Sequence, residues 1–383
     1  MDNSQKTVIV GMSGGVDSSV SALLLKEQGY NVIGMFMKNW EEQDEFGVCQ
    51  SAKEYADVVK VCEKLDIPYY SVDFVKEYHD NVFKYFVEEY EKGNTPNPDI
   101  LCNREIKFKV FFEKAMELGA DYLATGHYCQ KVDSENGPLL VKGVDNNKDQ
   151  TYFLYTMKEE VLDKVLFPIG HLEKSKVREL AKAHDLITHN KKDSTGICFI
   201  GERNFKNFLS NYIKSQQGDF RTLENEKVGE HGGVSFYTVG QRKGLGLGGP
   251  GEPWFVVDKD VSSNTVFVER GELHPALFTD YLYASELSLV SGDKLPIGKK
   301  LYSKVRYRQK DQECTVESYK DGVYKIKFLR PQRAIAPRQS IVFYEVINGV
   351  NVCLGGAVID NPGESYYSRD IEVSKKESHF TIG

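Results

Sequence analysis

The stretch VIVGMSGGVDSSVSALLL, residues 8 to 25, restricts the fold more than any other part of the sequence. A run rich in β-branched residues leads into small residues, and a helix is expected to begin near Asp17 or Ser18 and to stop at Gly29. Glycines allow successive backbone N–H groups to turn toward one point, and a helix N-terminus adds positive potential there. The stretch therefore predicts a strand, a loop that binds a phosphate group, and a helix.

Two common phosphate-binding patterns are missing from this loop, because it contains neither G-x-x-x-x-G-K-[ST] nor G-x-G-x-x-G. A tight turn in which glycine serves backbone geometry alone is the simpler alternative. Three glycines and three serines surround the expected helix start, and that concentration argues against the simpler alternative. We interpret the stretch as a phosphate loop of another kind.

The order of the expected elements indicates how the chain is divided. From residue 6 to about residue 130, strand-like runs alternate with helical patterns, as in a parallel sheet with helices on its faces, and a further helix is expected over about residues 173 to 187. Glycines crowd between about residues 204 and 275, before the strand-like WFVVD and TVFVERG. From about residue 278, alternating strands predict a compact β-barrel.

A chain of 383 residues is too long for one compact core, so we predict an α/β protein with three domains. A parallel-sheet nucleotide-binding domain is expected over residues 1–203, a small glycine-rich central domain over 204–277, and a C-terminal β-barrel with a loose tail over 278–383. The longest apolar runs are too short for a membrane span, and residues 1 to 10 lack the pattern of a signal peptide. A cytoplasmic protein without membrane association is therefore expected.

The net charge of −7 speaks against a nucleic-acid partner, but the charges are unevenly distributed. Residues 296 to 340 hold twelve Lys or Arg residues against four acids, a local balance of +8. Such a segment can bind a polyanion, and a solvated face of a β-domain is the alternative.

The segment PNPDILCNR, residues 96 to 104, places Cys102 in an unusual context. Pro96 and Pro98 are expected to bar a regular helix and to stiffen the approach, and Asp99 precedes the thiol by three residues. The nearby cations Arg104 and Lys107 would favour a thiolate. A buried structural thiol, as expected for Cys62, is the alternative.

A second candidate thiol, Cys198, lies in KKDSTGICFIGERNF and is flanked by Lys191, Lys192 and Arg203. Cys102 and Cys198 are 96 residues apart, so only the fold can bring them together. None of the seven cysteines forms a C-x-x-C pair, which disfavours a zinc site or a thioredoxin-type site.

The loop GMSGGVDSS resembles the S-G-G-x-D-S loop of the ATP pyrophosphatase (PP-loop) superfamily, in which the loop holds the pyrophosphate of ATP while a substrate oxygen attacks the α-phosphorus. Six further stretches follow it in order: TPNPDILCNREIKF, LATGHY, KDQTYFL, DSTGICFIGERNF, GQRKGLG and RPQRAIAPRQS. Together the seven resemble the bacterial tRNA-specific 2-thiouridylase family over about residues 6 to 360. This family makes 2-thiouridine at the wobble position of the tRNAs for lysine, glutamate and glutamine.

The resemblance implies a reaction in two parts. ATP adenylates the C2 oxygen of the wobble uridine, with a magnesium ion expected to neutralise charge, and a sulfur atom then replaces that oxygen. Cys198 would receive the sulfur as a persulfide from a carrier protein or a cysteine desulfurase, and Cys102 would resolve the bond. Asp99 would contact the base and act as general acid or base, and a turn aspartate is its alternative role.

The resemblance also implies contact residues. The expected ATP contacts are Gly11, Met12, Ser13, Gly14, Gly15, Val16, Asp17, Ser18, Met37 and Gly126. The expected tRNA contacts are Asn97, Pro98, Asp99, His127, Lys148, Asp149, Gln150, Arg306, Tyr307 and Gln339. No metal-ligating residue is predicted. An iron–sulfur cluster held by Cys102, Cys198 and a third ligand such as Asp99 is an open alternative, which the missing C-x-x-C disfavours.

Three functions are compatible with the sequence. The first is tRNA wobble-uridine 2-thiolation, supported by the ordered pair of cysteines. The second is a PP-loop ligase that adenylates a small molecule before amination, which needs no paired thiols. The third is a non-catalytic RNA-binding protein whose loop senses ATP.

Overall fold

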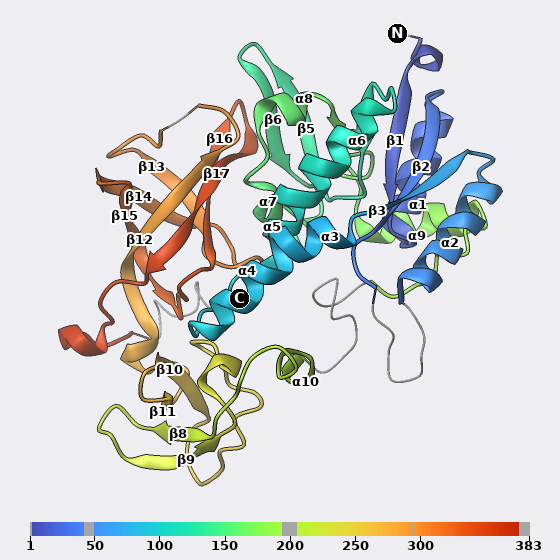
Figure 1. The fold of residues 1–383 in the computed structure, drawn as a ribbon. Coiled ribbons are helices and arrows are strands. Elements are labelled where there is room, and N and C mark those ends of the chain that lie inside the picture. The colour runs from blue at the N-terminus through green and yellow to red at the C-terminus, as the bar shows by residue number, and fades with distance from the viewer. Residues whose placement is uncertain (1, 42–49, 194–204, 293, 375–383) are drawn as a thin grey trace.

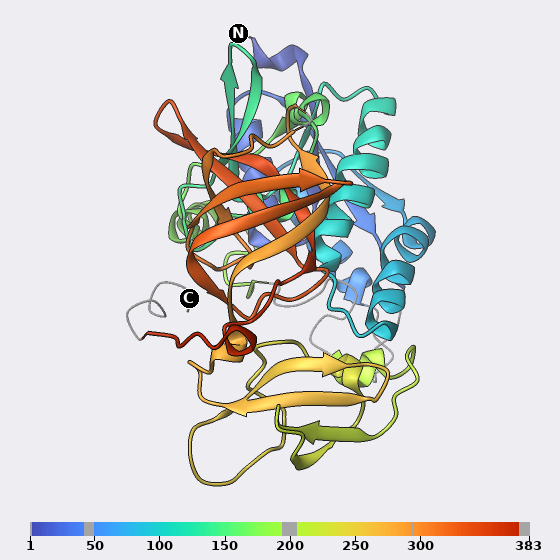
Figure 2. The same cartoon turned by 90° about the vertical axis from the view of Figure 1, so that its left-hand side faces the viewer.

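The computed structural model describes residues 2–41, 50–193, 205–292 and 294–374. Figure 1 shows an N-terminal α/β part, a small central part that contains β8 to β11, and a β-barrel. Figure 2 turns the barrel strands toward the viewer and shows the central strands below them. The predicted fold class is confirmed.

The N-terminal part is built on a parallel sheet of five strands in the order β3-β2-β1-β4-β7. Their bounds are Thr7–Met12 for β1, Asn31–Lys38 for β2, Tyr69–Asp73 for β3, Tyr122–Ala124 for β4 and Val165–Leu166 for β7. Side chains alternate across the sheet, so Val8 and Val10 face one core while Ile9 faces another. Both faces are therefore covered, as parallel sheets require.

Helices pack on the two faces. The face that contains Val8 is covered by α1 (Val16–Glu27), α2 (Gln50–Lys64) and α9 (Lys174–Ala183). The helix expected over residues 173 to 187 is thus shorter than predicted, because the chain turns at Asp185, whose φ is +52°. The other face is covered by α6 (Phe111–Glu117).

A long helical run leads into α6 and crosses the middle of the molecule in Figure 1. Its pieces are α3 (Val75–Tyr78), η2 (His79–Phe83) and α4 (Lys84–Glu91), followed after a short connection by α5 (Pro98–Leu101) and η3 (Cys102–Val110). The remaining short helices are η1 (Asn3–Gln5), α7 (Thr151–Leu154) and α8 (Glu159–Asp163). No helix within the described residues is both long and apolar enough to cross a membrane.

The central part contains a four-stranded sheet in the order β10-β11-β8-β9. Its elements are α10 (Phe205–Leu209), β8 (Gly218–Arg221), β9 (Lys227–His231), η4 (Val234–Phe236), β10 (Trp254–Asp260) and β11 (Thr265–Arg270). The strands predicted at WFVVD and TVFVERG correspond to β10 and β11. Between β9 and β10 no strand forms, and this glycine-rich connection passes next to the N-terminal part.

The barrel has six antiparallel strands and closes through the pairing of β12 with β17. Its strands are β12 (Phe278–Leu289), β13 (Lys300–Lys304), β14 (Gln312–Lys320), β15 (Val323–Arg333), β16 (Ser340–Ile347) and β17 (Val350–Asn361), with η5 (Pro275–Leu277) before and η6 (Tyr367–Arg369) after them. The hairpin of β5 (Cys129–Ser134) and β6 (Gly137–Lys142) extends this sheet, because Val141 pairs with Val352. The sequence did not predict this connection, which ties the N-terminal part to the barrel.

Candidate functional site

The phosphate loop lies where β1 ends and α1 begins. Gly14 has a φ of +70°, and an added Cβ atom there would lie 2.6 Å from the backbone oxygen of Glu54, so only glycine fits. The backbone N–H of Ser13 donates to Ser18 Oγ at 3.2 Å, and the hydroxyl of Ser19 donates to the carbonyl of Gly15 at 2.8 Å. These bonds fix the loop around the N-terminus of α1, and the exposed Ser13 faces the solvent.

The expected ATP contacts lie in this loop or beside it. Gly126 follows β4, and a Cβ atom there would lie 2.9 Å from Ser18 N, so the end of β4 abuts the first turn of α1. Met37 stands near the end of β2, beside β1, and is partly buried. The structure thus brings Gly11–Ser18, Met37 and Gly126 to the carboxyl ends of three neighbouring strands, where parallel sheets bind their ligands.

A lysine that the sequence analysis missed reaches the same place. Lys174 Nζ lies 2.8 Å from both carboxylate oxygens of Asp17, and the hydroxyl of Tyr128 donates to Asp17 Oδ1 at 2.7 Å. Lys191 Nζ donates to the carbonyl of Gly14 at 2.9 Å and pairs with Asp57 at 2.7 Å. The loop is therefore bordered by two cations from later parts of the chain.

Asp193 continues this charged network. It accepts Lys174 Nζ and an Arg178 N–H at 2.8 Å each, and Lys148 Nζ at 2.7 Å. Burial alone would raise the pKa of Asp193, but the hydrogen bonds from Lys148 and Lys174 lower the pKa to about 2. Asp193 therefore stays ionised and connects the phosphate loop to the segment of residues 148–150. Cys198, five residues further on, lies outside the described residues.

The turn that carries Asp99 and Cys102 begins a helix. Asn97 Oδ1 accepts the backbone N–H groups of Asp99 at 3.1 Å and Ile100 at 3.4 Å, and Pro98 is the first helical residue. The prediction that both prolines bar a regular helix was wrong for Pro98, because the first residue of a helix needs no N–H partner. Burial raises the pKa of the Asp99 carboxyl, although Lys107 opposes the shift.

Cys102 is 3% exposed and belongs to an aromatic cluster formed by α3, η2, α4 and α10. The cluster includes Tyr78, Phe86 and Phe208. Arg104, which the sequence analysis placed near the thiol as a charge, pairs with Glu105 at 2.7 Å. The surroundings of Cys102 are therefore more apolar than its sequence neighbours indicate.

Apart from Asn97, Pro98 and Asp99, the expected tRNA contacts fall into two groups. His127 is buried between the rings of Phe108 and Phe167, and its Nδ1 lies 2.8 Å from Thr125 Oγ1. Burial holds the pKa of His127 well below its usual value, so the imidazole is neutral. Asp149 is also buried and accepts the Thr151 hydroxyl at 3.0 Å. These two side chains hold the local structure in place.

The second group joins parts of the chain that lie far apart in the sequence. Arg306 donates to the carbonyl oxygens of Val239 and Ala334, and Gln339 donates to that of Thr95. Tyr307 packs on Phe153 with 4.4 Å between ring centroids, and its hydroxyl lies 3.4 Å from the carbonyl of Lys148. Gln150 Oε1 accepts the backbone N–H of Tyr128 at 2.9 Å. Lys148, Gln150 and Tyr307 therefore lie near one another.

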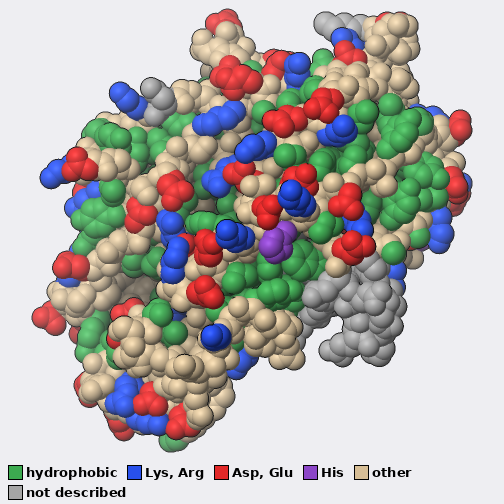
Figure 3. All heavy atoms as spheres, viewed as in Figure 1, with side chains coloured by type: hydrophobic (Ala, Val, Ile, Leu, Met, Phe, Trp, Pro, Cys, Tyr) green, Lys and Arg blue, Asp and Glu red, His purple; other side chains and the backbone are tan. Residues whose placement is uncertain are grey.

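The basic segment is less positive in the fold than along the chain. Lys327 pairs with Asp280 at 2.6 Å and Lys299 pairs with Glu345 at 2.5 Å, and both acids lie outside residues 296 to 340. Lys300 also pairs with Glu313. Figure 3 shows Lys and Arg side chains interspersed with Asp and Glu side chains on the visible face. Any polyanion would therefore meet selected cations here, and not a continuous positive patch.

Three family models match in succession: tRNA methyl transferase HUP domain over residues 6–202, tRNA methyl transferase PRC-barrel domain over 206–270, and aminomethyltransferase beta-barrel domain over 279–359. A tRNA-specific 2-thiouridylase MnmA from Protochlamydia amoebophila is 61% identical, covering 95% of this chain and 96% of the relative. The chain belongs to the tRNA-specific 2-thiouridylase family.

Another relative with that name, from Staphylococcus carnosus, is 56% identical over 94% of this chain and 97% of its own length. A solved 4-thiouridine synthetase in complex with RNA and ATP is 16% identical and covers 54% of this chain and 50% of that chain, with a TM-score of 0.35. The 2-thiouridylase assignment therefore depends on the near full-length relatives.

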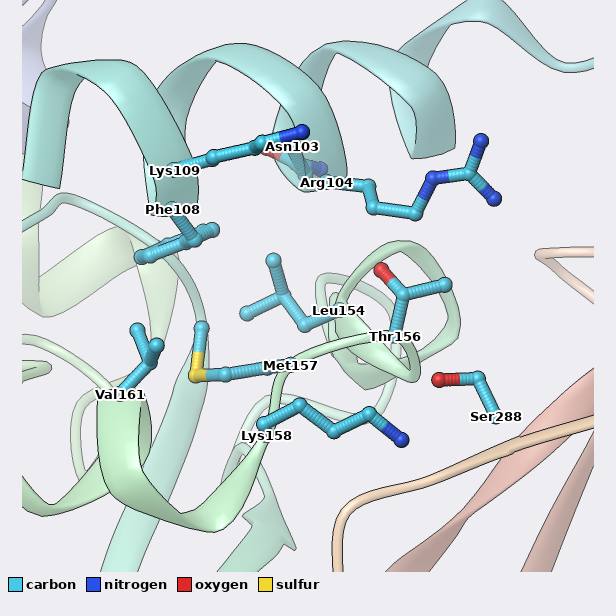
Figure 4. Close-up of a pocket in the computed structure, with 10 residues that line it drawn as sticks. All are labelled: Asn103, Arg104, Phe108, Lys109, Leu154, Thr156, Met157, Lys158, Val161 and Ser288. Atoms are coloured by element: carbon cyan, nitrogen blue, oxygen red, sulfur yellow. The ribbon is translucent and has the colours of Figure 1, made fainter.

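A cavity of about 260 Å³ lies beside the helix that carries Cys102. Figure 4 shows Phe108, Leu154, Met157 and Val161 on its apolar side. Polar and charged side chains complete its lining, namely Asn103, Arg104, Lys109, Thr156, Lys158 and Ser288. This cavity is separate from the phosphate loop. No group of three or more His, Cys, Asp or Glu side chains that could hold a metal ion occurs among the residues that the structure describes.

The residues that sequence reasoning missed share a physical cause. Lys174 has one weak signal, a cation at the N-terminal end of a helix, where the helix dipole disfavours positive charge. Asp193 and Tyr128 have none, because each acts through a partner distant in sequence. The sequence thus shows the candidate phosphate loop but not the charged side chains that surround it.

Proposed function

We propose that this protein is an ATP-dependent tRNA uridine 2-sulfurtransferase that acts on the wobble uridine. The observation that carries the proposal is the 61% identity with a tRNA-specific 2-thiouridylase over nearly the whole chain. Supporting it, the phosphate loop and the turn with Asp99 and Cys102 belong to the same domain model, over residues 6–202. The substrates would be the tRNAs for lysine, glutamate and glutamine.

The first step is activation of a poor leaving group. The C2 oxygen of uracil attacks the α-phosphorus of ATP, the bond from that phosphorus to the pyrophosphate oxygen breaks, and pyrophosphate leaves toward the Ser13–Ser18 loop. The backbone N–H groups at the start of α1 and the ammonium of Lys174 would stabilise the departing charge. Asp99 would accept the N3 proton of the base as the oxygen becomes esterified.

A magnesium ion at this site would have few protein ligands. Mg²⁺ commonly takes one or two carboxylates together with substrate phosphates, and Asp17 is a partly exposed carboxylate in the first turn of α1. We therefore assign Asp17 as the residue that would hold Mg²⁺, which would supply charge neutralisation when bound. Lys174 would then be free to contact phosphate oxygens.

The second step transfers sulfur. The terminal sulfur of a Cys198 persulfide attacks C2, and the C2–O bond breaks as AMP leaves. The Cys102 thiolate then attacks Cys198 Sγ, which forms a disulfide between the two cysteines and releases 2-thiouridine, with the proton returning to N3 from Asp99. A thiol reductant restores both cysteines, and a carrier protein or a cysteine desulfurase reloads Cys198 with sulfur.

The predicted tRNA contacts would bind the RNA at several places on the molecule. Asn97, Pro98 and Asp99 would hold the extruded base, because a stacked wobble base cannot reach a buried thiol. Lys148, Gln150 and Tyr307 would contact the RNA nearby, and Arg306 and Gln339 would do so further along the barrel. His127 and Asp149 would act by supporting the surrounding backbone.

The test is incubation with ATP, magnesium, a sulfide source and unmodified tRNA, followed by nucleoside analysis. We expect 2-thiouridine together with pyrophosphate from the wild type, and no 2-thiouridine from Cys102→Ser or Cys198→Ser. Full activity of both variants would favour a PP-loop ligase, and tRNA binding without pyrophosphate release would favour a non-catalytic RNA-binding protein. A parallel reaction with S-adenosylmethionine, analysed for methylated nucleosides, tests the methyl transfer that the descriptions of the family models name.

Iron analysis tests the remaining mechanistic alternative. Protein purified without oxygen is expected to thiolate tRNA without bound iron. Stoichiometric iron on which activity depends would replace the persulfide mechanism with an iron–sulfur mechanism.

A further inference from the structure

Residues 93–95, just before the turn with Asn97 and Asp99, are held by side chains from both other domains. Lys259 of β10 donates through Nζ to the carbonyl oxygen of Gly93, and also to that of Tyr237 at 2.6 Å. Burial lowers the pKa of Lys259 to about 8, with Asp258 opposing the shift, so the ammonium is mostly protonated at pH 7. A cation of the central domain thus contacts the backbone of the catalytic domain.

Two further hydrogen bonds hold Thr95, and one side chain packs against Gly93. Thr95 Oγ1 lies 3.1 Å from Thr238 Oγ1 of the central domain, and the carbonyl oxygen of Thr95 accepts Gln339 Nε2 of the barrel. Val261 packs against Gly93, whose φ is +77°, so closely that a Cβ atom there would lie 2.3 Å from Val261 Cγ2. Gly93 therefore contacts the central domain, and Thr95 contacts both the central domain and the barrel.

The end of α4, directly before this segment, is held in the same way. Glu89 is 2% exposed, and its Oε2 accepts Asn94 Nδ2 at 2.7 Å and Arg338 Nε at 3.1 Å. Removal of Arg338 would leave a buried carboxylate with fewer partners. The barrel therefore fixes the helix end as well as Thr95.

The chain between Thr95 and Asp99 transmits a displacement with little loss. Pro96 and Pro98 each fix their own φ and restrict the residue before them to extended backbone, and Asn97 has a φ of −103° and a ψ of 101°. Asn97 is further held by accepting the N–H groups of Asp99 and Ile100. A shift of Thr95 would therefore be passed on to Asp99 and Cys102.

We propose that the central domain positions the turn of residues 97–102 through Thr238 and Lys259, which are positioning residues for the sulfur-transfer reaction. The role of the turn in that reaction rests on the proposed function, whereas the mechanical connection does not. Gln339 is a candidate tRNA contact, and its single amide N–H₂ group holds the carbonyl of Thr95. When RNA recruits that amide, Thr238 and Lys259 keep the turn in place.

Peptide-level mass spectrometry of cysteine alkylation, under reducing conditions, tests the mechanical connection. Thr238→Val and Lys259→Met should raise the alkylation rate of Cys102 several-fold and leave that of Cys62 unchanged, because Cys62 lies in the core beneath the parallel sheet. Thr238→Ser retains the hydroxyl and should behave as wild type. Lys227→Met removes an exposed lysine of the same domain and is the matched control. Unchanged Cys102 rates in both variants would overturn the proposal, as would an equal rise at Cys62, which indicates general destabilisation.

Activity provides the second readout. We expect thiolation kcat to fall about two- to tenfold in Thr238→Val, the range for loss of one neutral hydrogen bond, and more than about tenfold in Lys259→Met. The Kd for ATP, measured without tRNA, should stay within about twofold, because the phosphate loop does not contact residues 93–95. Wild-type protein that makes no 2-thiouridine would refute the proposed function and leave the alkylation result to decide the connection. Full thiolation by both variants would refute the positioning role.

Discussion

Replacement of Lys174 by methionine tests whether the charged border of the phosphate loop binds the nucleotide. The ammonium of Lys174 contacts Asp17 and Asp193 at 2.8 Å each, and the Lys174 side chain is 11% exposed. Methionine keeps most of the apolar stem and removes the charge. Two carboxylates would then face each other with one cation fewer.

The cost to stability follows from Asp193. Its pKa is lowered from 3.8 to about 2, a shift worth about 2.4 kcal/mol at 1.36 kcal/mol per unit. Lys148 and Lys174 share that value, and the Asp193 side chain is 31% exposed, so screening reduces the part due to Lys174 to about 1 kcal/mol. Because the pKa is lowered in the folded state, this stabilisation is present above about pH 4 and is lost as the pH falls toward 2.

The cost to nucleotide binding should be larger. A charge-assisted hydrogen bond to a phosphate is worth about 1.5–3 kcal/mol, so the Kd for ATP should rise about 10- to 100-fold in Lys174→Met. Calorimetric titration with ATP measures this, and urea unfolding at pH 7 measures stability. Lys176→Met is the matched control, because Lys176 lies on the same helix, is exposed and pairs with its neighbour Glu179 at 3.1 Å. ATP binding by Lys174→Met as tight as that of the wild type would refute the reasoning.

Three other substitutions have defined outcomes. Asp99→Asn should lower the thiolation rate about 10²- to 10⁴-fold. It should also raise the stability of the protein at pH 7 in urea unfolding, because a carboxyl whose pKa is raised in the folded state destabilises the protein as the pH rises above the unfolded pKa. A variant as stable as the wild type would contradict the burial argument. Gly14→Ala forces a side chain against Glu54 O at a φ of +70°, so unfolding should cost about 1–3 kcal/mol less and ATP binding should be lost, whereas wild-type binding would show that the loop adapts. Gly126→Ala would place a Cβ atom 2.9 Å from the backbone of Asp17 and Ser18, so it should lower the free energy of unfolding by about 1–3 kcal/mol and weaken ATP binding about tenfold. Wild-type values for both would show that the end of β4 can move away from α1.

Local patterns in the sequence were sufficient for several features. The strand, loop and helix at residues 7–27 follow from β-branched residues, glycines and a serine-rich helix start, all of which act within a few residues. Strand β15 follows from alternation with period two, whereas β16, which is buried at five consecutive positions, follows from its run of β-branched and aromatic residues. The expected extent of α9 and the effect of Pro98 were wrong, since a left-handed residue ended the helix and a first-turn proline is tolerated.

Contacts between distant segments depended on tertiary structure. The pairing of Lys174 with Asp17 joins residues 157 positions apart, and the contact of Gln339 with Thr95 joins residues 244 positions apart. Neither leaves a periodic signal, because an ion pair or an amide contact across domains imposes no spacing on its neighbours. The aromatic surroundings of Cys102 are also assembled from separate helices and could not be inferred from the cations next to it.

The sequence by itself determined the class of fold, the phosphate loop and the family, because each is written in residues that act on their near neighbours or in ordered motifs. Only the tertiary structure decided which charges border the loop, how the hairpin of β5 and β6 joins the barrel, and which domains hold residues 93–95. Those features depend on packing between surfaces that meet only in the folded chain, and the strength of such contacts does not depend on how far apart the residues lie in the sequence.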